Sequence, residues 1–139
     1  MGPSAIRYAG LTPALQALGH TVVDAGNIPV PLPEQEPEEP EALRARHLSS
    51  IAGVCAAIYE AAHRCTAHGE IPIFLGGDHS LSIGTVSAVT AEPGRVGVLW
   101  VDAHGDFNTP EITPSGNVHG MALAALLSLI HISEPTRPY

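Results

Sequence analysis

The sequence predicts an α/β fold in which helices cover a mainly parallel sheet. Two apolar runs, residues 71–75 and 96–101, have the length and character of buried strands. A helical pattern precedes the first run, and a second one, at about residues 81–91, separates the two. Strands that alternate with helices usually lie parallel in one sheet, because the helix returns the chain to the end where the previous strand began. The length of 139 residues is that of one domain.

The elements expected near the N-terminus are short. Ser4 can cap a helix that runs through Tyr8. Thr12 can cap a second helix, because the proline that follows it at position 13 suits the first helical position. Residues 21–24 are expected to form a short strand before a loop rich in proline and glutamate.

Residues 41–68 are predicted to form an amphipathic helix, because apolar side chains recur every three or four positions along this segment. These positions are Leu48, Ile51, Cys55, Ile58, Ala62 and Cys65. Gly69 is expected to end the helix as the residue after its C-cap. His47, His63 and His68 lie on or near this helix, and we interpret them as surface or packing residues rather than ligands.

Composition and charge exclude several classes of protein. The net charge of −8 argues against a surface that binds nucleic acid. No apolar stretch reaches 18 residues and no signal peptide opens the chain, so no membrane association is expected. Cys55 and Cys65 are interpreted as buried thiols in a reducing compartment, and a cytoplasmic location follows from these observations.

A group of ionisable residues follows the second apolar run. Asp102, His104 and Asp106 alternate along the chain, so in an extended segment their side chains share one face. They can surround a small ligand only if the chain curls after Asp102, and Gly105 permits this. A solvated loop is the alternative interpretation of this pattern alone.

The first apolar run ends in a similar way, in the sequence G-G-D-H-S. Ligand sites in open α/β sheets lie beyond the carboxyl ends of the strands, so His79 is expected near Asp102, His104 and Asp106. Two imidazoles and two carboxylates suit Mn, Fe, Zn or Ni better than metals that prefer thiolates. Asp78 is interpreted as a turn or helix-capping residue.

Four motifs together carry a resemblance to a known family. They are G-P-S-A-I-R at residues 2–7, G-G-D-H-S at 76–80, W-V-D-A-H-G-D-F-N-T-P at 100–110 and S-G-N-V-H-G at 115–120. In this order they resemble the arginase branch of the ureohydrolase (arginase/agmatinase) superfamily, over about residues 1–127. The resemblance implies a three-layer α/β/α fold with a mainly parallel sheet, of which this chain would contain about the first half.

The resemblance also implies a function, the manganese-dependent hydrolysis of L-arginine to L-ornithine and urea. Of two Mn²⁺ ions, one would be ligated by His79 and Asp106 and the other by His104. Asp102 would bridge the two ions. A hydroxide between them would attack the guanidinium carbon, oriented by Asp106. His119 would carry a proton to the leaving amine, since the pKa of an imidazole lies near neutrality.

In the arginase pattern Asn108, Ser115 and Asn117 hold the α-carboxylate and α-amino groups of the substrate. The motif N-T-P followed by S-G-N-x-H-G separates the arginase branch from agmatinases, whose substrate lacks the carboxylate. An agmatinase, another guanidino or formimino hydrolase, and an inactive truncated fragment remain alternative functions. The family commonly forms trimers or hexamers, so a homo-trimer or hexamer is expected for the full-length protein.

Two features depart from the family pattern. Arginases take further metal ligands from a later D-x-D-x-x-D motif, which has no counterpart in these 139 residues. Residues 128–139 do not resemble the family's continuation, and we interpret them as a foreign tail, so His131 and Glu134 are not counted as ligands. A half-sheet would leave an open strand edge and exposed apolar surface. We therefore expect the chain by itself to aggregate and to bind manganese weakly.

Overall fold

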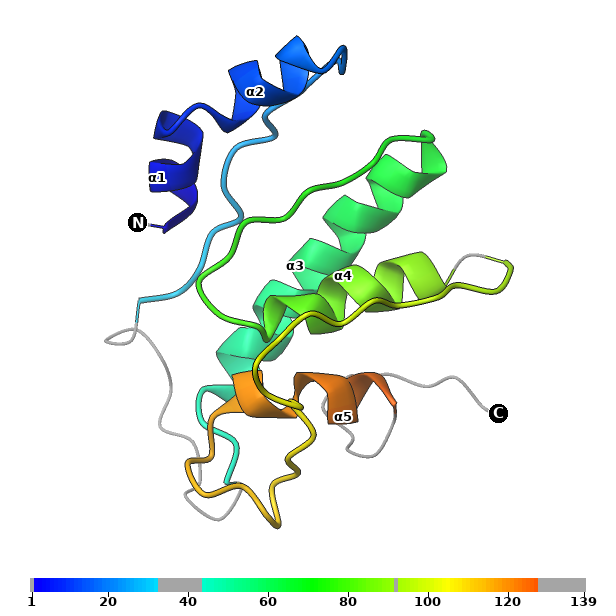
Figure 1. Ribbon diagram of the computed structural model, residues 1–139. Coiled ribbons are helices and arrows are strands. Elements are labelled where there is room, and N and C mark those ends of the chain that lie inside the picture. The colour runs from blue at the N-terminus through cyan, green and yellow to red at the C-terminus, as the bar shows by residue number, and fades with distance from the viewer. Residues whose placement is uncertain (1, 33–43, 92, 128–139) are drawn as a thin grey trace.

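The computed structural model describes residues 2–32, 44–91 and 93–127 (Figure 1). The helices, in chain order, are α1 (Gly2–Tyr8), α2 (Leu11–Ala17), α3 (Leu48–Ala67), α4 (Leu81–Thr90), the 3₁₀ helix η3 (Val118–Met121) and α5 (Ala122–Leu126). None of the helices in the described part of the chain is both long and apolar enough to cross a membrane. The foreign tail predicted at residues 128–139 lies outside the described residues.

Helices α3 and α4 pack directly against each other (Figure 1). Cys55, Ile58 and Ala62 are buried along one side of α3, which confirms the predicted apolar stripe. The backbones approach closely at Gly84 of α4, where a Cβ atom would lie 2.4 Å from the carbonyl oxygen of Cys55. A residue without a side chain is therefore needed at this crossing.

The core continues from this helix pair to η3 and α5. Its buried members are Ala45, Cys55, Ile83, Val118, Met121, Ala122, Ala124 and Ala125. Leu48, Ile51 and Trp100 pack against them from the rim. Most of these side chains are small, so the backbones of the helices can lie close together, and the loop that leads into α5 is held near α4.

The end of α3 follows the sequence prediction. His68 is the C-cap and Gly69 has a left-handed backbone, with a φ of 72°. The N–H of Gly69 donates to the carbonyl oxygen of Thr66 at 2.9 Å, and that of Glu70 donates to Cys65 at 3.0 Å. These two bonds form a Schellman motif, which satisfies carbonyls that the helix itself leaves unpaired.

The helix starts differ from the predictions. Within the described residues α3 begins at Leu48 instead of near residue 41, because Arg44 and Arg46 are bonded to a distant loop instead of to the helix. Ser4 lies inside α1 and does not cap it. Helix α2 begins at Leu11 after Gly10, which has a φ of 97°, so Thr12 is not its cap.

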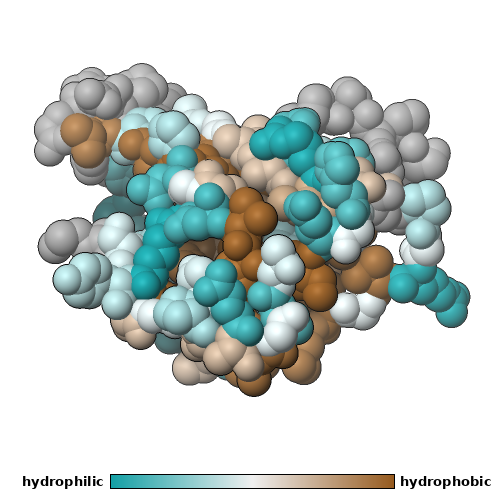
Figure 2. Space-filling view, turned by 90° about the horizontal axis from the view of Figure 1, so that it is seen from above, coloured by the Kyte–Doolittle hydropathy of each residue, from teal (hydrophilic) through white to brown (hydrophobic). Residues whose placement is uncertain are grey.

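The strands predicted at residues 21–24, 71–75 and 96–101 are not formed in the described part of the chain. There the β pairing consists of one isolated parallel bridge, between Arg46 and Asn117. Many apolar side chains of the predicted strands face solvent, and Leu99 is 89% exposed. Figure 2 shows hydrophobic atoms at the surface between hydrophilic regions. A strand requires hydrogen bonds from a neighbouring strand, and the described residues offer none to these segments.

Candidate metal centre

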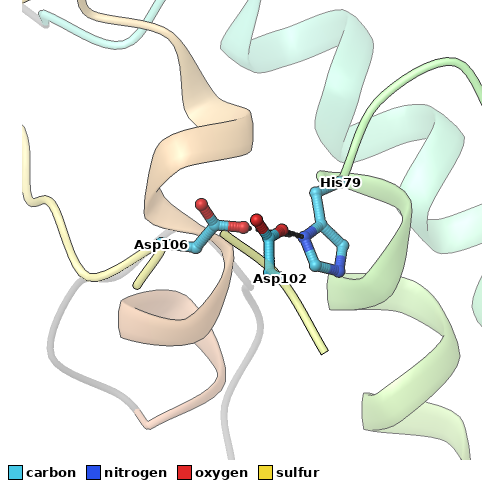
Figure 3. Close-up of side chains that lie close together, drawn as sticks. All are labelled: His79, Asp102 and Asp106. Carbon is cyan, nitrogen blue, oxygen red and sulfur yellow. Dashed lines mark hydrogen bonds and ion pairs between the residues drawn. The ribbon is translucent and has the colours of Figure 1, made fainter. Parts of the chain in front are cut away.

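Three of the predicted ligands, His79, Asp102 and Asp106, come together in the structure (Figure 3). The Nδ1 atom of His79 lies 2.6 Å from Oδ2 of Asp102 and 2.8 Å from Oδ2 of Asp106. One potential ligand atom from each residue lies within 4.8 Å of those of the other two. Residues that are up to 27 positions apart in the chain therefore bring three potential ligand atoms close together.

A short turn before α4 positions His79. The Oδ1 atom of Asp78 accepts hydrogen bonds from the backbone N–H of Ser80 at 2.9 Å and from its hydroxyl at 2.5 Å. Asp78 is thus a turn residue, as predicted. The ring of His79 stacks on the indole of Trp100, with the centroids 4.2 Å apart and the planes at 24°. The turn fixes the backbone of His79, and the indole fixes the plane of its ring.

The backbone of Asp106 is anchored to the core. Its carbonyl oxygen accepts hydrogen bonds from the N–H groups of Leu123 and Ala124 at 3.0 and 3.2 Å. Its φ is 48°, in the left-handed region, which aspartate tolerates better than most residues. Its side chain is only 5% exposed. The first turn of α5 therefore holds a buried carboxylate facing His79.

Asp102 lies between two imidazoles. Its Oδ2 atom faces His79, whereas its Oδ1 atom lies 3.2 Å from Nδ1 of His104 and accepts the backbone N–H of His104 at 2.8 Å. The N–H of His104, followed by the hydrogen bonds from the two imidazoles, lowers the pKa of Asp102 below its ordinary value. Asp102 is therefore an ionised carboxylate with one oxygen directed to each histidine.

The geometry fits a cation. Nδ1 of His79 can share one proton with only one of the two carboxylates that face it. Among the described residues Oδ2 of Asp106 is buried without a hydrogen-bond partner, although it lies 2.8 Å from that nitrogen. Such an atom is costly to bury unless something compensates it. A metal ion would satisfy all three ligand atoms, and their N/O chemistry suits Mn, Fe, Zn or Ni. The cluster can thus hold a metal ion.

The other two histidines predicted at the site lie outside this cluster. His104 is beside Asp102, but its side chain is 82% exposed and turned to solvent. His119 comes from η3, is half exposed, and has its Nδ1 atom 3.9 Å from Oδ2 of Asp78. The neighbouring turn residue Asp78 thus links His119 to the sequence segment that carries His79.

The three residues predicted to bind substrate lie on the loop between Asp106 and η3. The N–H of Asn108 donates to the carbonyl oxygen of Gly120 at 3.0 Å, which closes the loop at its base. The hydroxyl oxygen of Ser115 accepts the N–H of Asn117 at 3.2 Å. Ser115 is exposed and Asn117, the residue directly before η3, is half buried, so these two lie together where the loop enters η3.

Sequence reasoning missed two residues that organise this region. Trp100 is part of an apolar run, and nothing in that run indicates that its ring would stack on His79. Arg44 donates to the carbonyl oxygens of Glu111 and Thr113, which are 67 and 69 positions away. No local pattern could have indicated these contacts, because both partners are backbone atoms of a distant loop.

Comparison with known proteins identifies close relatives. An arginase of Bacillus caldovelox is 44% identical over 131 residues, which cover 94% of this chain and 44% of that protein. An arginase of Bacillus subtilis strain 168 is 41% identical over 133 residues, which cover 96% of this chain and 44% of that protein. The chain therefore spans less than half the length of these curated relatives.

Solved arginase structures are also similar to this chain in fold. The Bacillus caldovelox arginase structure matches with a TM-score of 0.86 and 44% identity, covering 92% of this chain and 42% of that one. The Bacillus cereus arginase structure matches with a TM-score of 0.81 and 42% identity, covering 92% and 41%. These neighbours have the α/β fold that the sequence predicts. The arginase family model matches residues 1–136, and on this match along nearly its whole length the chain belongs to the arginase family.

Proposed function

We propose that the whole protein is a manganese-dependent hydrolase that converts L-arginine to L-ornithine and urea. The observation that carries the proposal is the convergence of His79, Asp102 and Asp106, with Asp102 directing its second oxygen to His104. The arginase names of the relatives agree with this chemistry. Since the chain spans less than half of those relatives, the activity is assigned to the whole protein.

Four residues would hold the metal. His79 and Asp106 would ligate one Mn²⁺ ion, His104 would ligate a second, and Asp102 would contribute one oxygen to each. The division of Asp102 between two imidazoles supports this bridging role. When bound, the ions would supply a nucleophile at neutral pH by lowering the pKa of water.

The carboxylates have separate tasks in this proposal. The Oδ2 atom of Asp106, which faces His79, would ligate the metal, so the other oxygen of this buried carboxylate would accept the hydrogen bond that orients the nucleophile toward the substrate carbon. Its backbone anchoring to α5 keeps this oxygen in place. Orientation by a fixed acceptor lowers the entropy cost of attack on the planar guanidinium.

His119 would transfer a proton to the amine that leaves. Its imidazole is half exposed, so it can exchange protons with solvent, and Asp78 lies within ion-pair distance of it. Asn108, Ser115 and Asn117 would bind the α-amino and α-carboxylate groups through their amide and hydroxyl atoms. The substrate would then span from the metal cluster to the part of the loop that enters η3.

The test is urea release by the manganese-loaded full-length protein, measured in parallel with L-arginine and agmatine. Arginine is expected to be the preferred substrate, and His79→Ala is expected to abolish urea release. Faster release from agmatine would replace the arginase proposal by an agmatinase. Release from neither substrate would overturn the hydrolase proposal and favour an inactive member of the family.

A further inference from the structure

Arg44 holds the loop that carries Ser115 and Asn117. Its guanidinium donates from Nη1 to the carbonyl oxygen of Glu111 at 3.1 Å and from Nη2 to that of Thr113 at 2.5 Å. The two donors belong to one rigid planar group, so they fix the relative position of two carbonyls that are two residues apart. A flexible single donor could not impose this spacing.

The backbone next to Arg44 holds the same loop a second time. The N–H of Arg46 donates to the carbonyl oxygen of Gly116 at 2.8 Å, within the parallel bridge that pairs Arg46 with Asn117. Gly116 has a φ of 74°, and a Cβ atom there would lie 3.4 Å from the carbonyl oxygen of Arg44. The loop therefore lies directly against the segment that precedes α3.

The interior of the loop is ordered by its own hydrogen bonds. Thr113 is 1% exposed, and its hydroxyl oxygen accepts the N–H of Gly116 at 3.0 Å. Ser115 accepts the N–H of Asn117. Once Arg44 fixes the carbonyl of Thr113, these bonds transmit the position to Ser115 and Asn117.

The segment that makes these contacts has a strained backbone. Arg44 and His47 have φ values of 45° and 58°, in the left-handed region that non-glycine residues rarely adopt. Strain of this kind persists only where surrounding contacts determine the conformation, and it is concentrated at functional sites. Here the strained residues flank the bridge to Asn117, so the segment is shaped for that contact.

We propose that Arg44 is a positioning residue for substrate selection: by holding residues 111–117, it sets the spacing of Ser115 and Asn117 that recognises the amino-acid end of the substrate. This inference rests on the proposed function. Arg44 is not a member of the metal cluster, and it would act only through the loop that its guanidinium binds. Its loss should therefore affect a substrate with an α-carboxylate more than one without it.

The kinetic test uses Arg44→Ala in the manganese-loaded full-length protein. The KM for L-arginine is expected to rise about tenfold with kcat within about threefold, the size expected for losing the paired hydrogen bonds that hold the loop. The kcat/KM for agmatine is expected to stay within about twofold. Arg44→Lys keeps the charge but not the planar pair of donors. Its KM for L-arginine should therefore lie between those of the wild type and Arg44→Ala. Arg95→Ala is the matched control, because Arg95 is an exposed arginine outside the contacts that Arg44 makes with the loop. It should change the kcat/KM of neither L-arginine nor agmatine.

A second measurement, which does not depend on enzyme activity, tests the clamp, meaning the hydrogen bonds from Arg44 to the carbonyl oxygens of Glu111 and Thr113. Hydrogen exchange of the same variants should show faster exchange at the amides of Arg46 and Gly116 in Arg44→Ala, with α3 unchanged. Equal losses for arginine and agmatine, or faster exchange throughout the chain, would reduce Arg44 to a general structural role and overturn the proposal. A wild-type protein that releases no urea would contradict the proposed function. Unchanged hydrogen exchange at residues 111–117 in Arg44→Ala would contradict the role of Arg44 in holding the loop.

Discussion

In α3, α4 and α5 the apolar side chains are buried against one another, whereas in residues 71–75 and 96–101 most of them face solvent. Both regions are apolar, although the helices contain more alanine and the extended segments more branched aliphatic residues. A helix forms its hydrogen bonds within its own chain segment and needs only a face to bury. An extended segment needs a partner for every second backbone group as well. The difference shows that apolar sequence determines burial only when the backbone groups are also paired.

The proposed metal ligands lie at the boundary between the two regions. Asp106 is tied by its carbonyl oxygen to the first turn of α5 and is buried. His104 follows an unpaired segment and is exposed. The part of the site that the helical core supports is therefore formed in this chain, and the part that the extended segments support is open to solvent.

The largest expected effect comes from placing the same charge in each region. Ile83→Lys, in the core of α4, should lower the free energy of unfolding by about 4 kcal/mol or more, because an unpaired charge would be buried. Leu99→Lys, in the exposed segment, should change it by less than about 0.5 kcal/mol and should reduce self-association. Urea unfolding and sedimentation velocity measure both quantities. Equal destabilisation by the two variants would mean that residue 99 is buried in solution.

Metal affinity should separate the anchored ligand from the exposed one. Asp106→Ala is expected to weaken Mn²⁺ binding roughly a hundredfold, since it removes the buried carboxylate, whereas His104→Ala should weaken it no more than about tenfold. Titration of the free ion by electron paramagnetic resonance gives both constants. Asp24→Asn, which changes a carboxylate paired with Arg7 far from the cluster, is the control. A larger loss from His104→Ala would reverse the assignment of the stronger ligand.

The close contact between α3 and α4 can be tested with two glycines. Gly84→Ala should lower the free energy of unfolding by about 2 kcal/mol, because its methyl group would meet the carbonyl oxygen of Cys55. Gly53→Ala lies on α3 with no atom within 4 Å of the added carbon, and it should stabilise the chain by about 0.5–1 kcal/mol. Chemical unfolding followed by circular dichroism compares them. A stabilising Gly84→Ala would show that the two helices are farther apart in solution.

The smallest effect is a pH dependence from Asp102. The folded chain lowers the pKa of this carboxyl, so its contribution to stability is present above the unfolded value of about 3.9 and is lost as the pH falls through the folded pKa. In metal-free buffer, Asp102→Asn should therefore be less stable than the wild type at neutral pH, and the difference should shrink below about pH 4. A constant difference from pH 7 to pH 3 would contradict this role for the carboxylate.

Local features of the fold could be predicted because their causes are local. The period of the apolar residues places α3, and Gly69 ends it because glycine alone adopts the required backbone without cost. The turn at Asp78 follows from a side chain that bonds two residues ahead. The alternation of Asp102, His104 and Asp106, with His79 at the end of another apolar run, indicated a shared site, and three of the four residues converge.

What the sequence by itself determined is the presence of α1 to α4, the end of α3 at Gly69 and three members of the cluster, since periodicity, a glycine after a helix and motif spacing act over a few residues. The tertiary structure alone decided that α3 begins at Leu48, because Arg44 and Arg46 are bonded to a loop about 70 positions away. It also decided that Trp100 stacks on His79 and that Asp106 is buried while His104 is exposed. Each of these depends on which distant backbone groups are available as partners, and no local pattern records that.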